Sequence, residues 1–461
     1  MSEQQSFDRE VASWIALEGE INAPGRALDD ILNATSRKRP LPRWLALIKE
    51  PPMRISSNVA IGSPTQRVAA IIVATTLIAL MAAGAGSAGS RLVAADGTIV
   101  VDQSGNGTTT TITEAVEMAM DGETILVRPG TYDESIVLAK DVTIRGDGDR
   151  DAVVVEPSVE TPPNVGCSAP DLPTAFVFER SDATLENLTL RGESARIIIL
   201  GGAPLLRDLV LDGIGRVYLL DPGSSCVPTG LDINEGSTAT IRDSLMSDMD
   251  IDIESGSSPS IISNEFTTGA IWMQGTGVDP IIRGNVIEGS VKWGISIGGG
   301  ARPTVESNTI TGAATAIEIE DTGWAISDIG TDPVLRGNTI SGSTRAGVSV
   351  GRGATATIEE NELIDNSTGI SLTASDAAIE DNAITGGQAG ITIVADGSPT
   401  LTGNTVEGVT ARGIAIADGS PTLTGNVLCG NGTNLWVADD AEPTIVDSNE
   451  ICEVMPDGAG E

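Results

Sequence analysis

A repeat of about 22 residues, which runs from residue 141 to residue 449, constrains the fold of this chain more than any other feature. Each repeat contains an Asn or Asp that is followed two residues later by an aliphatic or aromatic residue, and most of these markers are 21 to 23 residues apart. Between them lie alternating segments such as GISIG at 294–298 and GITIV at 390–394. The markers are Asp141, Asn187, Asp208, Asp243, Asn264, Asn285, Asn308, Asn338, Asn361, Asn382, Asn404, Asn426 and Asn449.

A period of this length, built from two or three short alternating strands with Gly and Asn at the bends, is typical of one coil of a parallel β-solenoid. Stacked coils bury their inward Ile, Val and Leu side chains in one narrow core, which suits a chain with only 3 % aromatic residues. Asn at a corner tolerates left-handed backbone angles and can form a ladder of side-chain amides. The thirteen markers predict twelve coils and a rod of roughly 58 Å, at about 4.8 Å per coil.

The start of the repeat region carries a family resemblance. Residues 107–148 read GTTTTITEAVEMAMDGETILVRPGTYDESIVLAKDVTIRGDG and are followed by GNTI-type coils. Over about residues 97–453, this pattern resembles the bacterial right-handed parallel β-helix proteins of the pectin-lyase-like superfamily. The resemblance implies an all-β fold with an N-terminal capping helix near residues 112–119, where Thr111 and Glu114 are placed for a capping box. The superfamily includes polysaccharide lyases and hydrolases but also members without known activity, so the fold alone implies no reaction.

The part before the repeat has a different character. Residues 1–67 carry 9 basic and 8 acidic side chains, whereas the remaining residues carry 18 and 56. An uninterrupted apolar run follows at 68–90, long enough to span a bilayer, and the basic cluster before it predicts a cytoplasmic N-terminus. The alternative is a signal peptide, because AGAGSAGS is rich in small residues. We therefore predict four regions: a cytoplasmic tail with short helices at 1–67, a single-pass transmembrane helix at 68–90, an extracytoplasmic β-helix at 97–453 and a disordered tail at 454–461.

Composition excludes several functions. The net charge of −37 argues against nucleic acid as a partner, and the absence of histidine excludes Ser-His-Asp triads and His-ligated zinc. The remaining candidate partners are the membrane, a polysaccharide or surface protein along the rod, and a weakly bound cytoplasmic protein at the short helices of the tail.

The four cysteines predict two disulfides. Cys429 and Cys452 each lie three residues after their marker Asn on successive coils, so their Cα atoms should be about 5 Å apart. Cys167 and Cys226 lie in insertions at one corner, two coils apart. Insertions at 156–175, 220–230 and 321–328 share that corner, and clustered loops are one way in which a solenoid builds a binding face. The alternative is that insertions are simply tolerated there.

An acidic cluster is the first candidate site. In the segment MDIDIESG, inward Ile residues place Asp250, Asp252 and Glu254 on the outer face, and Asp232 lies on the same face one strand away. Hard oxygen ligands suit Ca²⁺, which makes these four residues candidate calcium ligands, and no other cofactor is predicted. The resemblance adds that pectate lyases place calcium-binding carboxylates on such a face beside a basic residue, for which Arg196 and Arg216 are the nearest candidates. The alternative is a solvated acidic face.

An aromatic cluster is the second candidate site, for glycan binding. It comprises Trp272, Trp293 and Trp324 on three successive coils, with Lys292, Glu318 and Glu320 close in register. Outward tryptophans can stack on sugar rings, and a pair of carboxylates is what glycoside hydrolysis requires. Trp272 could instead point inward, because a slip of one residue reverses its face.

Two functions follow from these patterns. The hypothesis that the residues favour is a membrane-anchored, non-catalytic β-helix that binds a glycan or another surface partner. The alternative is a polysaccharide lyase or glycoside hydrolase that uses the region 232–254 or 272–324. The missing histidines and the short Ser, Thr and Ala side chains at outward positions of the later coils favour the first hypothesis.

Overall fold

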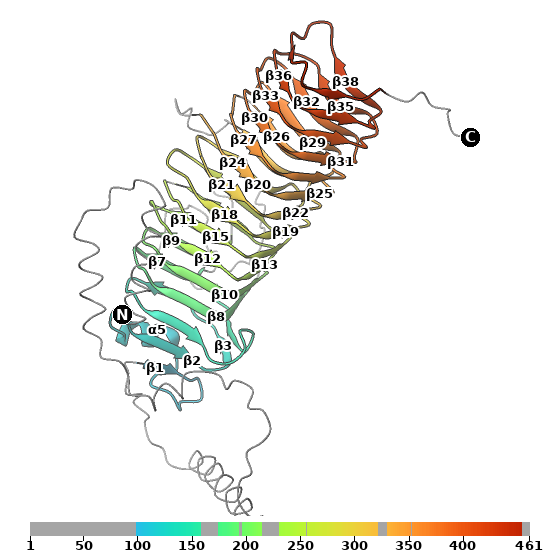
Figure 1. The fold of residues 1–461 in the computed structure, drawn as a ribbon. Helices are drawn as coiled ribbons and strands as arrows, with labels where there is room; N and C mark the ends of the chain where they lie inside the picture. Colours follow the sequence, from blue (N-terminus) through green and yellow to red (C-terminus); the bar gives the residue numbers. More distant parts are fainter. Residues whose placement is uncertain are drawn as a thin grey trace, which may run out of the picture. The chain divides into compact units, whose positions relative to one another are not determined.

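The computed structural model describes residues 98–157, 174–192, 196–213, 230–254, 256–320, 330–351 and 353–453. Over these residues the chain forms a parallel β-solenoid, in which every strand pairing is parallel (Figure 1). A full coil consists of one strand of a 13-stranded sheet followed by two short strands of a 27-stranded sheet. We call these sheet B and sheet A. The predicted all-β solenoid is therefore confirmed.

Sheet B contributes one strand to each coil, and its strands are β4 (Ile136–Leu138), β7 (Thr174–Glu179), β9 (Arg196–Leu200), β11 (Leu231–Asn234), β14 (Asp250–Ile253), β17 (Ala270–Gln274), β20 (Trp293–Gly298), β23 (Thr315–Glu320), β26 (Ala346–Gly351), β29 (Thr368–Thr373), β32 (Ala389–Val394), β35 (Arg412–Ile416) and β38 (Thr433–Val437). In the described residues sheet B has one more strand than the twelve coils predicted, because the marker intervals begin after β4, and β1 of sheet A stacks before the coil of β4.

Sheet A contains the remaining strands, most of which are three or four residues long: β1 (Thr98–Val101), β2 (Thr124–Val127), β3 (Gly130–Tyr132), β5 (Thr143–Gly146), β6 (Val153–Val155), β8 (Thr184–Arg191), β10 (Leu205–Asp212), β12 (Thr240–Arg242), β13 (Leu245–Ser247), β15 (Ser260–Ile262), β16 (Glu265–Thr267), β18 (Ile281–Arg283), β19 (Val286–Glu288), β21 (Thr304–Glu306), β22 (Thr309–Thr311), β24 (Val334–Arg336), β25 (Thr339–Ser341), β27 (Thr357–Glu359), β28 (Glu362–Ile364), β30 (Ala378–Glu380), β31 (Ala383–Thr385), β33 (Thr400–Thr402), β34 (Thr405–Glu407), β36 (Thr422–Thr424), β37 (Val427–Cys429), β39 (Thr444–Ile445) and β40 (Glu450–Ile451).

A short helix, α5 (Ile112–Met118), covers the first coil, as predicted. Its apolar side chains Ile112, Ala115 and Val116 are buried against β1, β2 and β4. The Thr111 side chain accepts a hydrogen bond from the backbone N–H of Glu114. Two further N–H groups of the first turn donate to the carboxylate of Glu134, so the free N–H groups at this helix end have partners.

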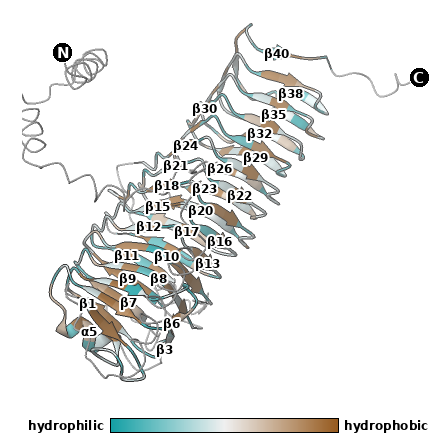
Figure 2. Ribbon diagram, turned by 60° about the horizontal axis from the view of Figure 1, so that its bottom comes forward, coloured by the Kyte–Doolittle hydropathy of each residue, from teal (hydrophilic) through white to brown (hydrophobic). Residues whose placement is uncertain are grey.

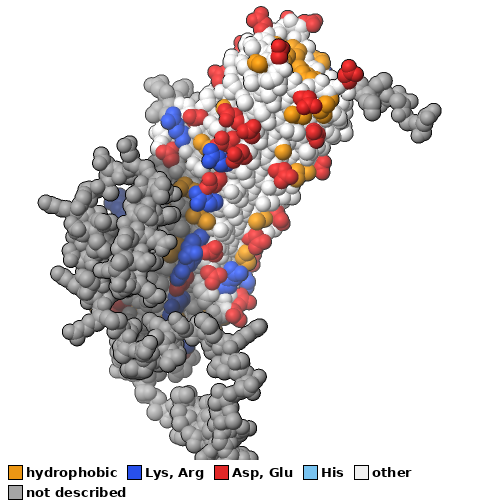
Figure 3. All heavy atoms as spheres, viewed as in Figure 1, with side chains coloured by type: hydrophobic (Ala, Val, Ile, Leu, Met, Phe, Trp, Pro, Cys, Tyr) orange, Lys and Arg blue, Asp and Glu red, His pale blue; other side chains and the backbone are white. Residues whose placement is uncertain are grey.

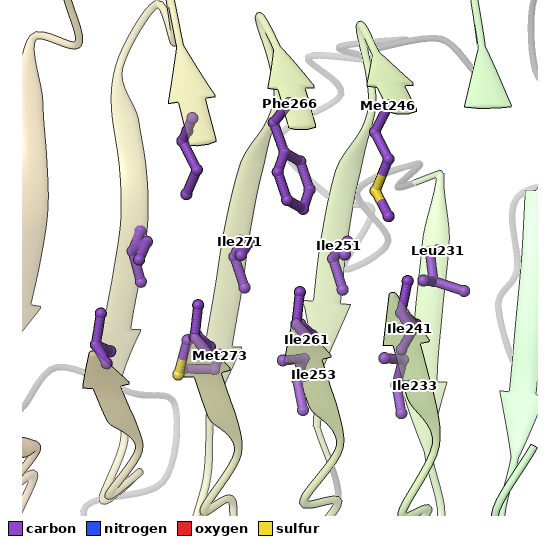
Figure 4. Packing of buried hydrophobic residues seen from close by; sticks show 14 of the residues in the cluster. Leu231, Ile233, Ile241, Met246, Ile251, Ile253, Ile261, Phe266, Ile271 and Met273 are labelled. Carbon is purple, nitrogen blue, oxygen red and sulfur yellow. The ribbon is translucent and has the colours of Figure 1, made fainter. Parts of the chain in front are cut away.

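The core is a stack of mainly aliphatic side chains from both sheets (Figure 4), and Figure 2 shows hydrophobic residues recurring on the strands of the solenoid. Strand alternation places Ile251 and Ile253 of β14 inward, and they lie in register with Leu231 and Ile233 of β11. Each of these four side chains is fully buried. Burial of such a side chain contributes about 1.5–3 kcal/mol, so a coil without aromatic residues can still be stable.

An asparagine ladder runs along one corner from Asn264 to Asn449, as predicted. Each side-chain amide donates to the amide oxygen of the next marker Asn, as Asn285 does to Asn308 over 3.0 Å, and also to a backbone carbonyl of the preceding coil. The predicted left-handed backbone is found at the earlier markers Asn187, Asp208 and Asp243. From Asn264 onward it falls instead on the residue before several ladder Asn residues, such as Ser263 or Glu360, while the backbone N–H of the ladder Asn donates to the next amide oxygen.

One predicted disulfide is formed. Cys429 at the end of β37 is bonded to Cys452, with their Cα atoms 5.0 Å apart, as stacking of successive coils predicts. Cys167, Cys226 and most residues of the three predicted insertions lie outside the described residues.

The predicted location in a membrane is corrected by the structure. Within the described ranges, no helix is long and apolar enough to cross a bilayer. The apolar run at 68–90, the tail at 1–67 and residues 454–461 lie outside the described residues. We therefore retain neither the single-pass anchor nor the extracytoplasmic placement.

Candidate functional site

The described candidate residues of both predicted sites lie on, or directly beside, six neighbouring strands of sheet B, from β9 to β23. We call this surface the charged face and define it by Arg196, Asp232, Asp252, Trp272, Trp293 and Glu318. Strand pairing sets one outward row, in which Asp232, Asp252, Trp272, Ser296 and Glu318 are consecutive partners. Neighbouring members of this row are about 4.8 Å apart. The acidic and aromatic clusters are therefore one continuous surface.

Arg196 and Asp232 form an ion pair at one end of the charged face. Both side chains are nearly buried, with 13 % and 12 % of their surface exposed. Burial raises the pKa of Asp232, and the guanidinium of Arg196 acts in the opposite direction. The base suggested by the resemblance is thus engaged with a carboxylate, and Arg216 lies outside the described residues.

Asp252 is the least compensated group of the charged face. Its Oδ1 is buried, and it has no hydrogen-bond partner. Burial raises the pKa of the Asp252 carboxyl well above its usual range, and the negative charges of Glu254 and Asp232 raise it further. A buried acceptor without a partner destabilises the fold by about 1–3 kcal/mol, so its presence calls for an explanation.

The other two acidic residues have partners. Asp250 accepts a hydrogen bond of 2.9 Å from the backbone N–H of Ala270, and Glu254 accepts one from the side chain of Gln274. The sequence did not predict the contact between Gln274 and Glu254. The outward position of Gln274, one coil after Glu254, could have indicated it.

The four carboxylates do not form a calcium cage. Within the described ranges, the one group of acidic or cysteine side chains that places three ligand atoms within 4.8 Å of one another is Cys429, Glu450 and Cys452, in the last coils. Ca²⁺ takes six to eight oxygen ligands, and Asp232, Asp250, Asp252 and Glu254 do not place three of them within that distance, so calcium binding by these residues stays a prediction.

Trp272 and Trp293 stack on each other. Their ring centroids are 5.8 Å apart and their planes are inclined by 25°. Trp272 points outward, since its neighbours Ile271 and Met273 are buried, which settles the question of its face. The ammonium of Lys292 lies 3.4 Å from the centroid of the Trp293 ring. The indole Nε1 of Trp293 is buried and has no hydrogen-bond partner.

Glu318 and Glu320 lie on β23, at the other end of the charged face. Glu318 is in register with Ser296, which follows Trp272 in the outward row, and Glu320 is in register with Gly298. Both carboxylates are half-buried. Trp324, the third tryptophan of the predicted cluster, lies outside the described residues. The structure thus brings together five of the six predicted glycan-contacting residues on three successive coils of sheet B.

Charged side chains on sheet A are arranged differently. There, ion pairs join neighbouring coils, as Arg207 does with Glu186, Arg283 with Glu306 and Arg336 with Glu359. Figure 3 shows basic and acidic side chains lying next to each other on the surface in view. In each of these pairs the arginine side chain is exposed and the glutamate side chain is more buried, and such pairs are an ordinary way to stack charged coils.

Comparison with solved structures finds other proteins with similar chain traces. The periplasmic alginate epimerase AlgG is 14 % identical, with a TM-score of 0.46 over 71 % of this chain and 79 % of that chain. The A-module of the mannuronan C-5 epimerase AlgE6 from Azotobacter vinelandii is 13 % identical, with a TM-score of 0.44 over 74 % and 94 %. The catalytic unit of a GH87 α-1,3-glucanase from Streptomyces thermodiastaticus is 15 % identical, with a TM-score of 0.48 over 74 % and 65 %.

Sequence comparison gives the family. No curated protein matches this sequence. The family model described as "Right handed beta helix region" matches residues 175–327, 229–383 and 325–451, which together cover more than half of the chain. These matches contain the charged face and every coil from β7 to β40. The chain therefore belongs to the right-handed β-helix family.

Proposed function

We propose that this chain binds a glycan on the charged face and does not cleave it. The observation that carries the proposal is the stacked pair Trp272 and Trp293, held on the outer face of sheet B next to carboxylates. Aromatic rings present a flat apolar surface to a sugar ring, while neighbouring polar groups can bond its hydroxyls.

Trp272 is the ring that we expect to contact the sugar. Trp293 already has Lys292 over its ring and Trp272 stacked against it. In the described part of the chain, no other aromatic or cationic group lies over Trp272. Trp272 also lies between Asp252 and Ser296 in the outward row, so a stacked sugar has a polar side chain on either side.

A panel of soluble and insoluble polysaccharides tests the proposal. We expect at least one glycan to be retained without release of reducing ends or unsaturated products, and Trp272→Ala to abolish that retention. Trp436→Ala is the matched control, because Trp436 belongs to the same outward row on β38, five coils beyond β23. Retention that survives Trp272→Ala, or is absent for every glycan, would refute the proposal.

A second candidate function is glycoside hydrolysis at Asp232 and Asp252. These two carboxylates lie on adjacent strands, and burial raises the pKa of Asp252 while Arg196 partly offsets the effect of burial on Asp232. Two carboxyl groups with different environments are what an acid and a base or nucleophile require. Release of products by the wild-type chain, abolished by Asp252→Asn, would establish this function and overturn binding without cleavage.

A further inference from the structure

We propose that the charged face selects a glycan that carries a free amino group, and that Asp252 binds this ammonium. The inference rests on the proposed function and goes beyond it by naming the class of glycan. The observation behind it is that buried polar atoms without a hydrogen-bond partner are unevenly distributed over the described residues. The structure describes five such side-chain atoms, and three of them lie on sheet B within the charged face: Arg196 Nε, Asp252 Oδ1 and Trp293 Nε1.

Such atoms are rare in folded proteins because each one loses its hydrogen bonds to water without replacement. Three of them on one outer face, spread over strands β9 to β20, indicate a surface whose hydrogen bonds are completed by something that binds there. Two of the three, Arg196 Nε and Trp293 Nε1, are donors and suit sugar oxygens. Asp252 Oδ1 is an acceptor and needs a donor from the ligand.

The position of Asp252 fits a substituent of the sugar that stacks on Trp272. The two residues are register partners on β14 and β17, so their Cα atoms lie about one strand spacing, or 4.8 Å, apart. A pyranose ring centred on Trp272 therefore carries its substituents to the carboxylate of Asp252.

The charges around Asp252 identify that substituent as a cation. Near Asp252 in this part of the face, Asp232 has Arg196 as its counterion, whereas Glu254 accepts a hydrogen bond from the neutral amide of Gln274. In the described part of the chain no cation pairs with Asp252. A ligand ammonium supplies both the donor and the missing charge, whereas a hydroxyl supplies the donor alone.

The same charges exclude the opposite class of glycan. A uronate would bring its carboxylate next to Asp252 and Glu254, in a chain whose net charge is −37. Without a cation between them, these groups repel each other. A bare metal ion is not the expected occupant either, because the neighbouring carboxylates do not place three oxygen atoms within 4.8 Å. The burial and the neighbouring charges that raise the pKa of Asp252 in the free protein would be countered by a bound ammonium.

Calorimetric titration of the full chain with three short oligosaccharides of equal length tests the inference: a glucosamine oligomer, its fully N-acetylated counterpart and a uronate oligomer. We expect the glucosamine oligomer to bind at least about tenfold more tightly than the other two, since a charge-assisted hydrogen bond is at stake. Asp252→Asn, which keeps the side-chain volume, should remove this preference.

Asp396→Asn is the matched control, because it removes one negative charge at an exposed position on the coil of β32 and should leave the preference intact. Equal binding of the acetylated oligomer by the wild-type chain would overturn the inference and requires no variant. A preference that persists in Asp252→Asn, or that Asp396→Asn also abolishes, would overturn it as well. If the acetylated oligomer binds equally well and its binding requires Trp272, the proposed function stands and only the choice of glycan fails.

Discussion

Sheet B has two halves that share a core and differ on their outer face. From β11 to β23 the outward row carries three carboxylates, one tryptophan and one serine, whereas from β26 to β35 it carries Ser349, Ser371, Thr392 and Ala415. Inward positions remain aliphatic and buried in both halves. A coil therefore needs only its inward side chains and its corner residues in order to fold. Its outward positions can vary and can carry a binding site.

The largest expected effect concerns the buried core, which the two halves share. Ile295→Ala in the first half and Ile370→Ala in the second half each remove a fully buried side chain from equivalent core positions. Each should lower the free energy of unfolding by about 2–5 kcal/mol, and by similar amounts. Urea denaturation measures both. A much smaller loss in either half would show that the two cores are not equivalent.

The next effect tests the difference between the halves. Trp272→Ala should weaken binding of any retained glycan by about tenfold or more, because truncating a central aromatic contact is among the costliest changes at a binding surface. Trp436→Ala should leave the affinity unchanged, since Trp436 is covered by Arg412, 3.9 Å from its ring centroid, and lies beyond the second half. Isothermal titration of both variants checks this. Equal losses would mean that the contact is not confined to the charged face.

Asp252, in the first half, should make the free energy of unfolding depend on pH. Its pKa is raised in the folded chain, so the folded state holds a proton that the unfolded state has already released. Stability therefore falls as the pH rises from the ordinary aspartate range toward the folded-state pKa, and the loss persists above that value. Asp252→Asn should remove this slope and raise the stability at neutral pH by about 1–3 kcal/mol.

Thermal unfolding at several pH values, with Asp396→Asn as the control, measures that change. The carboxylate of Asp396 is exposed, so its substitution should leave the slope as it is. A neutral-pH stability of Asp252→Asn at or below that of the wild-type chain would show that the ionised Asp252 carboxylate does not destabilise the fold.

Much of this fold follows from the sequence. The marker Asn residues, the alternating strands, the helix at Thr111 and the bond between Cys429 and Cys452 all depend on a period that is visible in the residues. The shift of the left-handed angle to the residue before many of the later Asn markers was missed, because a period shows where a corner lies but not which residue takes the strained angle.

The site was only partly predictable for a related reason. Alternation places Asp252 and Trp272 outward, and their register makes them neighbours. The ion pair of Arg196 with Asp232, the stacking of Trp293 on Trp272 and the lone Oδ1 of Asp252 depend on side-chain rotamers and local burial. No spacing in a single sequence encodes those.

The smallest expected effect concerns an ordinary outward position. Ser371→Ala, in the outward row of β29, should change the free energy of unfolding by no more than about 0.5 kcal/mol and should leave glycan binding unaltered. Denaturation and titration check both values. A clear loss of binding would show that part of the glycan site lies in the second half, and the two halves would then not differ as described.

Hydrogen–deuterium exchange with and without the glucosamine oligomer tests the central claim most directly. We predict increased protection in β14, β17 and β20, which present Asp252, Trp272 and Trp293, and unchanged exchange in β26, β29 and β32. Protection that appears only in the second half, or equally along all of sheet B, would contradict a glycan site on the charged face.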